Sequence, residues 1–535
     1  TRGGRRTAAR AEDTVPAEVA QPVSVNVGAW TDAELEIAQP ATLTVSVSRE
    51  AIDLPGGVAA GVAGIAEADP TRALIVMVIG RKNLKVTGKS TQSVAVPAAG
   101  QPAELFFGIE GISLGDAQLD VIVRQTEAPL AKIVLRPTVV QEVRNGGRAE
   151  ATGMATPSAA PGPPRHQLYI SEITDGAETR YRFHLELLRP GEPPEPVEAD
   201  SNPLKGDKSA YVSALYRRIE EMWGDTRDKV DEFARKIRAE GGTLWDELIP
   251  APIQRLLWEN RDAIGFIQVY SDEPFIPWEL IHMKQPGKRT LPKESLFLAE
   301  LGLVRWILSD DESVCTRAPG RLRIESGKVH AIIPEYPPAS GWQLTSTLAE
   351  MDMLTATFGA ATRTEATFDA VVELLSDGGF DLLHYAGHGV GDSANIGDEA
   401  LVLSVARNGA RWEPDSKLGP VDVSNSASLA ESPCDDFRPI VFLNCCETGR
   451  AGYTLTSVGG LASSFLKAGA GVIVSPLWSV DDAAAAEFSA SFYSALKTGE
   501  TLASAARTAR AKIRDSGDQT WLAYTIYGEP SATLV

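Results

Sequence analysis

The sequence predicts a multidomain protein with an N-terminal all-β sandwich, a helical and mixed middle section, and a C-terminal α/β domain with a mostly parallel sheet. Three observations predict this organisation. A chain of 535 residues is too long for a single hydrophobic core. Short Val-rich stretches separated by Gly and Pro recur over residues 20–142. From about residue 264 onward, apolar strands alternate with helical runs.

The composition is that of an ordinary globular protein, with 43% hydrophobic and 23% charged residues. A formal net charge of −20 argues against a general nucleic-acid binder, because phosphate contacts need a basic face. No run reaches the ~18–20 apolar residues of a spanning helix, so we expect no membrane partner. The four cysteines do not suggest a disulfide framework, which favours a reducing cytoplasm.

The first part of the chain divides into a flexible N-terminus, residues 1–19, and a β-sandwich regulatory or recognition domain, residues 20–145. Its expected strands are 22–27, 41–48, 73–80, 92–97, 103–109, 119–124 and 132–137. Residues 83–90 approach the pattern of a phosphate-binding P-loop, but Asn83 stands where the first glycine belongs. We therefore expect no phosphate site there.

A Gly-, Pro-, Ala- and Ser-rich stretch, residues 146–165, predicts a linker. Residues 166–262 form a mixed region, with an expected strand pair followed by amphipathic helices. The α/β domain covers residues 263–535. Its expected strands are 265–270, 329–334, 380–387, 439–446, 471–478 and 521–528, and its expected helices include 344–359, 367–376, 458–469, 483–499 and 502–514.

Two predicted strands of this domain end in residues that can take part in catalysis. The stretch 380–391 ends in His388 and Gly389, and the stretch 438–452 contains Cys446. Ligands of parallel sheets sit beyond the carboxyl ends of the strands, so a thiol and an imidazole could meet there. A neighbouring His lowers the pKa of a thiol and later protonates the leaving amine. The backbone N–H groups of Gly389 and Cys446 could form an oxyanion hole.

His388 lies 58 residues before Cys446, close to the roughly 50 residues between the His and the Cys of caspases. Further segments from about residue 264 onward form a recognisable set: IPWEL (276–280), LLHYAGHG (382–389), FLNCCETG (442–449), VIVSPLWSVDD (472–482), SFYSALKTGE (491–500) and YGEPSATL (527–534). In these segments the chain resembles the CHAT family of caspase-related cysteine peptidases, which is related more distantly to separases.

The resemblance implies that His388 is the general base and Cys446 the nucleophile. Cys445 stands where the family usually has Ala. Adjacent residues of a strand point to opposite faces, so only one of the two thiols can face His388, and the alignment selects Cys446.

The segment 478–482 is similar to a separase segment that gives acidic character to a pocket accepting Arg. Asp481, Asp482 and Asn444 are therefore candidates for a pocket that favours a basic P1 residue. The alternative for the two aspartates is capping of the helix that follows. If P1 is basic, the Arg-containing stretch 406–412, expected as a hairpin or loop, is a candidate self-processing site.

The sequence thus predicts a cytoplasmic cysteine endopeptidase that acts through a Cys–His dyad on a specific protein substrate, without a cofactor. We expect no metal site, because His384 and His388 lack a matching third ligand. The resemblance suggests activation by a partner or signal through the N-terminal domain and a role in bacterial antiviral defence or cell death, for example on a gasdermin-like protein. The alternative is a catalytically inactive caspase fold kept as an interaction scaffold.

Overall fold

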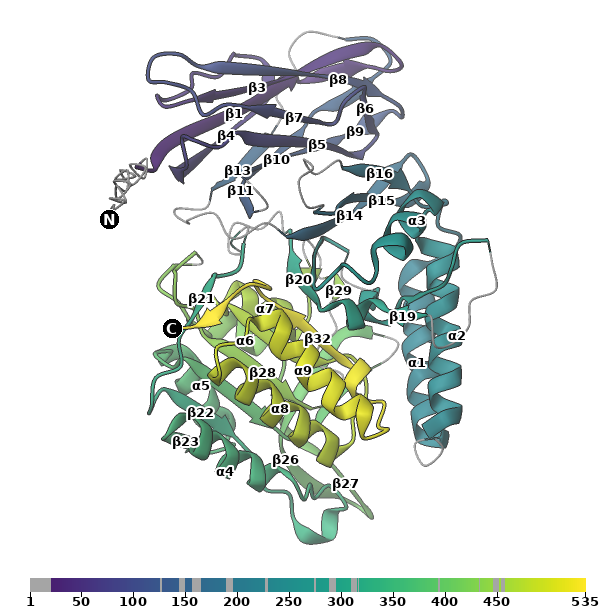
Figure 1. Ribbon diagram of the computed structural model, residues 1–535, viewed down its shortest axis with the longest axis vertical. Helices are drawn as coiled ribbons and strands as arrows, with labels where there is room; N and C mark the ends of the chain where they lie inside the picture. The colour runs from purple at the N-terminus through teal and green to yellow at the C-terminus, as the bar shows by residue number, and fades with distance from the viewer. Residues whose placement is uncertain are drawn as a thin grey trace, which may run out of the picture.

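The computed structural model (Figure 1) has a strand-rich N-terminal region, helices in the middle and a mixed α/β region at the C-terminus, as predicted. It describes residues 21–125, 128–143, 150–155, 165–188, 196–226, 230–273, 276–287, 295–308, 315, 317–392, 395–432, 434–445, 452–453 and 458–535. The expected flexible N-terminus and Cys446 lie outside the described residues.

The described N-terminal region contains two large sheets that share one hydrophobic cluster, as expected for a sandwich. A small third sheet consists of β2 (Glu34–Glu36), β12 (Thr138–Val140) and β9 (Gly115–Asp116). The first sheet contains, in order, β4 (Val58–Ala68), β1 (Val23–Asp32), β3 (Pro40–Ser48), β8 (Ala103–Gly111) and β6 (Leu84–Thr87). The second begins with β13 (Glu150–Ala155), β11 (Ala128–Arg136), β10 (Gln118–Gln125) and β5 (Leu74–Lys82), with β7 (Thr91–Val94) paired to β5. Alternating side chains such as Val27, Val45, Phe107, Val121 and Ile133 are buried between the two sheets.

The second sheet continues into the rest of the chain. Thr174 of β14 (His166–Asp175) pairs with Lys82 of β5, and β14 runs parallel to β17 (Ile267–Ser271). β13 also pairs with β11 inside the range predicted to be a linker, so that prediction is wrong for residues 150–155. The sandwich is therefore joined to the α/β region by sheet pairing as well as by the chain.

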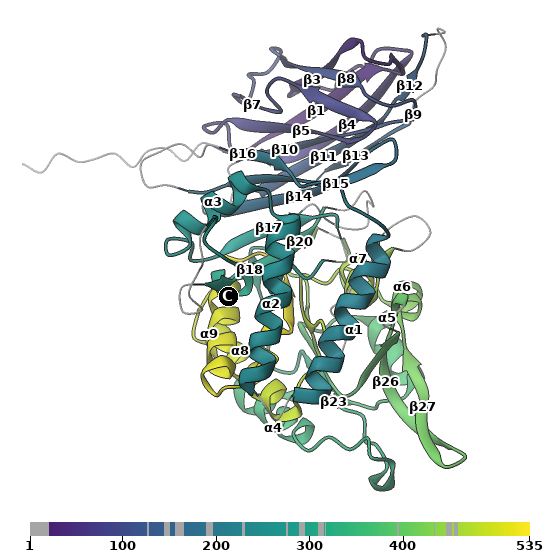
Figure 2. The same ribbon diagram turned by 90° about the vertical axis from the view of Figure 1, so that its right-hand side faces the viewer.

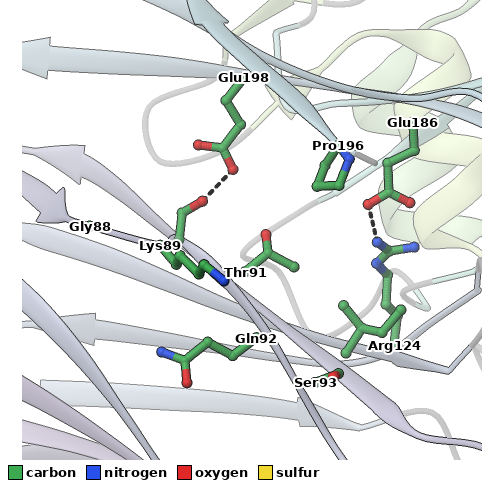
Figure 3. A pocket seen from close by; sticks show the side chains of 11 residues that line it. Gly88, Lys89, Thr91, Gln92, Ser93, Arg124, Glu186, Pro196 and Glu198 are labelled. Carbon is green, nitrogen blue, oxygen red and sulfur yellow. Dashed lines mark hydrogen bonds and ion pairs between the residues drawn. The ribbon is translucent and has the colours of Figure 1, made fainter. Parts of the chain in front are cut away.

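A cavity of about 460 Å³ marks the junction between the sandwich and the hairpin of β14, β15 (Glu178–Glu186) and β16 (Val197–Asp200). Figure 3 shows Lys89 and Thr91 on one side of it, with Glu186 and Glu198 opposite. Arg124 donates to Glu186 across the junction. His184 contacts both carboxylates, with its Nε2 2.9 Å from Glu186 and its Nδ1 3.0 Å from Glu198. The contact between Arg124 and Glu186 therefore ties the sandwich to the hairpin, and His184 joins β15 to β16 within it.

The middle of the chain supplies the helices α1 (Lys208–Thr226), α2 (Val230–Leu248) and α3 (Ala251–Asn260). Two long helices, α1 and α2, stand side by side along one flank of the molecule (Figures 1 and 2). Phe233, Ile237, Leu244 and Trp245 lie on the buried side of α2, at the helical spacing that the sequence shows.

The α/β sheet places the predicted site. Its strands follow in the order β17, β20 (Leu303–Ile307), β32 (Tyr524–Tyr527), β31 (Val472–Pro476), β28 (Ile440–Asn444), β24 (Leu382–Ala386), β22 (Val329–Ile332) and β23 (Ala361–Thr364). Among these described strands, neighbours run parallel except β31 and β32. The expected mostly parallel sheet is present.

Helices pack on both faces of this sheet: α4 (Thr347–Phe358), α5 (Phe368–Asp377), α6 (Pro420–Ser426), α7 (Leu461–Lys467), α8 (Asp482–Lys497) and α9 (Leu502–Asp515). Successive residues of β28 enter two different hydrophobic clusters. Ile440 and Phe442 join the cluster that contains residues of α8 and α9, whereas Val441 and Leu443 join the one that contains residues of α5 and α7. Burial of both faces explains why this strand reads as a continuous apolar run.

A small sheet follows the predicted base. β25 (Gly389–Asp392) pairs with β26 (Asn395–Asn408), which pairs with β27 (Arg411–Leu418). The two long strands project from the body of the molecule in Figure 2. The stretch 406–412 lies at their turn, as the sequence predicted.

Cys315 and Cys434 form a disulfide with their Cα atoms 5.3 Å apart. This bridge was not expected from the sequence, because 119 residues separate the two cysteines and neither lies in a recognisable spacing. Cysteine usage therefore no longer supports the predicted reducing compartment. Of the helices in the described part of the chain, none combines the length and apolar character that crossing a bilayer requires.

Candidate active site

The two predicted site segments lie at the same edge of the sheet. β24 and β28 are parallel neighbours whose last paired residues are Ala386 and Asn444. One further hydrogen bond, from the Gly387 N–H to the Asn444 carbonyl oxygen at 3.3 Å, holds the two strand ends together. His388 lies two positions beyond one member of this pair, and Cys446 follows the other member at the same interval.

The His388 side chain is held in one orientation. Its Nε2 lies 2.7 Å from the Trp342 carbonyl oxygen, which can only accept, so Nε2 carries the proton of the neutral ring. Nδ1 then keeps its lone pair. The ring centroid lies 5.0 Å from that of Trp342 and 5.1 Å from that of Tyr336. The fixed tautomer leaves one nitrogen able to act as a base.

The backbone of His388 is held as firmly as its ring. The Tyr336 hydroxyl accepts from the His388 N–H at 3.0 Å, and the Tyr385 hydroxyl lies 2.8 Å from the His388 carbonyl oxygen. Burial lowers the pKa of His388, while its contact with Trp342 and the charge of Asp482 partly oppose that effect. The imidazole is therefore mostly neutral at pH 7, as a general base must be.

Gly389 begins β25 and pairs with Leu401 of β26. This strand fixes the course of the chain directly after the imidazole. The second N–H group of the predicted oxyanion hole belongs to Cys446, outside the described residues, so the hole stays a prediction.

Cys445 is 2% exposed and packs in the same hydrophobic cluster as Leu443 and Tyr385. The side chain of Asn444 points to the opposite face, where Phe442 also lies. Side chains therefore alternate between the two faces of the strand end up to Cys445, as expected for adjacent residues of a strand.

The two candidate aspartates both accept hydrogen bonds from the backbone. Oδ1 of Asp481 lies 3.0 Å from the Ala483 nitrogen and 3.1 Å from the Ala484 nitrogen, so Asp481 is the N-cap of α8. Asp482 instead reaches a different segment, where its Oδ2 accepts from the N–H groups of Thr345 and Ser346 at 2.9 Å. The charge of Asp482 acts on His388, which places it near the predicted base.

Asn444 belongs to a buried polar network. Its amide donates to Glu350 at 2.7 Å and its carbonyl oxygen accepts from the Tyr524 hydroxyl at 2.5 Å. The same Glu350 carboxylate accepts from His384 at 3.0 Å and from Ser489 at 2.9 Å. Glu350 is 2% exposed and His384 is fully buried. His384 therefore has a structural partner in the core, and among the described residues no group of three or more His, Cys, Asp or Glu side chains is arranged to hold a metal.

Sequence reasoning missed both Trp342 and Glu350. Trp342 acts through its carbonyl oxygen, which every residue type has, so no side-chain signal exists. Glu350 did leave a signal, because it stands four residues before Leu354 and eight before Phe358 on the buried stripe of α4. A carboxylate on an apolar helix stripe indicates a buried polar partner.

The fold and the site together define an α/β domain with an oriented histidine at the carboxyl edge of a parallel sheet. A profile of the CHAT domain matches residues 238–529, more than half of the chain. The chain belongs to the CHAT-domain family, as the sequence predicted. Residues 29–135 match a domain of unknown function, DUF7363. No curated protein matches the sequence.

The chain also shows partial similarity to solved structures. The complex of the pro- and mature domains of Porphyromonas gingivalis RgpB shares 12% identity at a TM-score of 0.34, over 58% of this chain and 77% of that one. The Saccharomyces cerevisiae separase–securin complex shares 10% identity at a TM-score of 0.40, over 69% of this chain and 30% of that one. The family assignment rests on the domain match.

Proposed function

We propose that the chain is a cysteine endopeptidase in which Cys446 is the nucleophile and His388 the general base. One observation carries the proposal. The last residue pair between β24 and β28 is Ala386 with Asn444, and His388 and Cys446 each lie two residues after one member of that pair. The Trp342 carbonyl supports it, because it leaves Nδ1 of His388 as the basic nitrogen. The membership in the CHAT family supports it independently.

The reaction follows from these roles. His388 takes the thiol proton, and the sulfur attacks the carbonyl carbon of the scissile bond. The backbone N–H groups of Gly389 and Cys446 stabilise the resulting oxyanion. The C–N bond then breaks, His388 returns the proton to the leaving amine, and a thioester remains. A water molecule, deprotonated by His388, hydrolyses the thioester and releases the thiol.

For specificity we propose a basic P1 residue. The charge of Asp482, which acts on His388, supports this. A carboxylate near the scissile bond would pair with Arg or Lys through charge-assisted hydrogen bonds. Asp481 and Asn444 remain candidates, although the capping role of one and the buried contacts of the other already engage their side chains.

We further propose that the substrate is a specific protein and that a partner or signal activates the enzyme through the N-terminal region. The sheet pairing of β5 with β14 supports such coupling, because it joins the sandwich directly to the strands of the α/β region. A role in bacterial antiviral defence or cell death, for example on a gasdermin-like protein, rests on the family resemblance. The solved separase is bound to securin, a protein partner of that enzyme.

Hydrolysis of fluorogenic peptides with Arg, Lys, citrulline or Asp at P1 tests the proposal. We expect cleavage after Arg or Lys that Cys446→Ala abolishes and Cys445→Ala retains. Citrulline matches Arg in shape without its charge, so Asp482→Asn should lower cleavage after Arg more than after citrulline. An equal loss for both substrates would show that Asp482 only positions the segment it binds.

The scaffold alternative makes the opposite prediction. If the native chain labels with a thiol-reactive peptide probe no faster than Cys446→Ala, and no peptide is cleaved with or without cell extract as a source of activator, the peptidase proposal is wrong.

A further inference from the structure

A second feature of the α/β region is a cavity of about 320 Å³ on the outer side of α9. It lies between α9 and two short 3-10 helices, η3 (Leu298–Leu301) and η5 (Thr520–Leu522). Three arginines of α9 line it, Arg507, Arg510 and Arg514. They are three, four and seven residues apart, so they share one face of the helix.

The cavity has more positive than negative charge. Glu300 also lines it and accepts from Arg514 at 2.7 Å, and Asp515 lies 3.5 Å from the same arginine. Arg507 donates to the carbonyl oxygen of Gly265, at 2.8 Å. Within the described residues, neither Arg507 nor Arg510 has a carboxylate within ion-pair distance. Two guanidinium charges in the cavity therefore lack a counter-ion.

Of the two arginines, Arg510 has the greater need of a counter-ion, because its side chain is buried and only 3% exposed. It donates to the carbonyl oxygens of Ala299 at 3.2 Å, Leu303 at 3.5 Å and Tyr524 at 3.0 Å. Burial lowers its pKa to about 10. The charge of Glu279 partly opposes that effect but is not in direct contact with Arg510. A cation buried without a carboxylate in contact is costly, and a bound anion would offset that cost.

Two buried donors at the cavity also lack acceptors. Nε of Arg510 and Nε1 of Trp521 have no hydrogen-bond partner among the described residues. Trp521 lines the same cavity and is 3% exposed. Buried N–H groups of native proteins nearly always have a partner in the protein or in ordered water, so these two donors are available to an acceptor bound at the cavity.

We propose that this cavity binds a small ligand through a phosphate group. A phosphate carries close to two negative charges at pH 7, which matches the two guanidiniums that lack a counter-ion. Its oxygens accept the paired N–H groups of arginine in a planar fork. The volume holds about ten water molecules, enough for one or two phosphate groups with a small substituent.

The cavity is connected to the candidate active site. Arg510 donates to the carbonyl oxygen of Tyr524, and the hydroxyl of Tyr524 donates to Asn444. Asn444 is the last residue of β28, two positions before Cys446. The binding proposal does not depend on the peptidase proposal, because binding can be measured without substrate.

Isothermal titration of the full chain with inorganic phosphate and pyrophosphate, at constant ionic strength set with sodium chloride, tests the proposal. Arg507→Gln removes one cation of an exposed side chain, so the variant should fold. Lys512→Gln is the matched control, because Lys512 lies on the same helix, pairs with Glu487 at 3.2 Å and does not line the cavity. Both variants lose one positive charge.

We expect saturable binding to the native chain and to Lys512→Gln with equal affinity, and at least a tenfold weaker affinity for Arg507→Gln. Equal losses in both variants would mean that the anion senses only the overall charge, and would overturn the proposal. So would the absence of saturable binding to the native chain, or binding of acetate as tight as that of phosphate.

Discussion

The buried carboxylate of Glu350 offers the sharpest test of how the candidate site is built. Glu350→Ala removes the acceptor of three donors: His384, Asn444 and Ser489. Ser489 also donates to the Ala486 carbonyl oxygen, so it keeps a partner. The other two donors do not, since Tyr493 and Tyr524 contact different atoms of these side chains. Each buried donor without an acceptor costs about 1–3 kcal/mol.

The expected loss in the free energy of unfolding is therefore about 4 kcal/mol for Glu350→Ala. Glu350→Gln keeps one acceptor oxygen and should cost about 1–2 kcal/mol. Asp352→Ala is the matched control, because it removes an exposed carboxylate from the same helix and should change stability by less than about 0.5 kcal/mol. Urea denaturation followed by tryptophan fluorescence measures the three differences. A loss for Glu350→Ala as small as that of Asp352→Ala would refute the reasoning.

Three further results are expected. Because burial lowers the pKa of His388, the acid limb of kcat/KM for peptide cleavage should fall below pH 6.5, and a limb above pH 7 would contradict the observed environment. Burial tends to lower the pKa of His184, but its hydrogen bonds to two carboxylates raise that pKa overall. The free energy of unfolding should therefore decline as the pH rises from about 6.5 through the raised pKa, and His184→Gln should remove that decline. Urea denaturation midpoints measured at several pH values test both expectations. Replacing Cys315 and Cys434 together by Ala should cost about 2–4 kcal/mol, measured by the same denaturation, and the native bridge should appear in non-reducing peptide mapping.

The α/β region could be predicted from the sequence because its strands are buried on both faces. β28, for example, was expected over 439–446 and is observed as Ile440–Asn444. The N-terminal region was harder. β4 was missed because its sequence, VAAGVAGIAEA, is rich in Ala and Gly, which have low strand propensity. Its strand conformation comes from antiparallel pairing with β1, a long-range contact with no local signal.

In the candidate site, too, a residue with a local sequence signal could be predicted, whereas contacts between distant segments could not. His388 could be found because its residue type, its Gly neighbour and its place after an apolar strand all point to chemistry. The sheet pairing that joins the sandwich to the α/β region could not be predicted, since it depends on one residue pair, Thr174 with Lys82. The disulfide between Cys315 and Cys434 also joins distant segments. Contacts between segments far apart in the chain produce little recognisable pattern in the sequence of either segment.

One short segment, residues 342–350, contacts three residues of the candidate site: His388, Asp482 and Asn444. Its first residue, Trp342, orients His388 through a carbonyl oxygen. Its middle, through the N–H group of Ser346, binds Asp482 at the start of α8. Its last residue, Glu350, holds Asn444 at the end of the strand that leads to Cys446. A shift of this segment therefore changes the orientation of His388, the position of Asp482 and the end of β28 at once, which makes the three contacts mutually dependent.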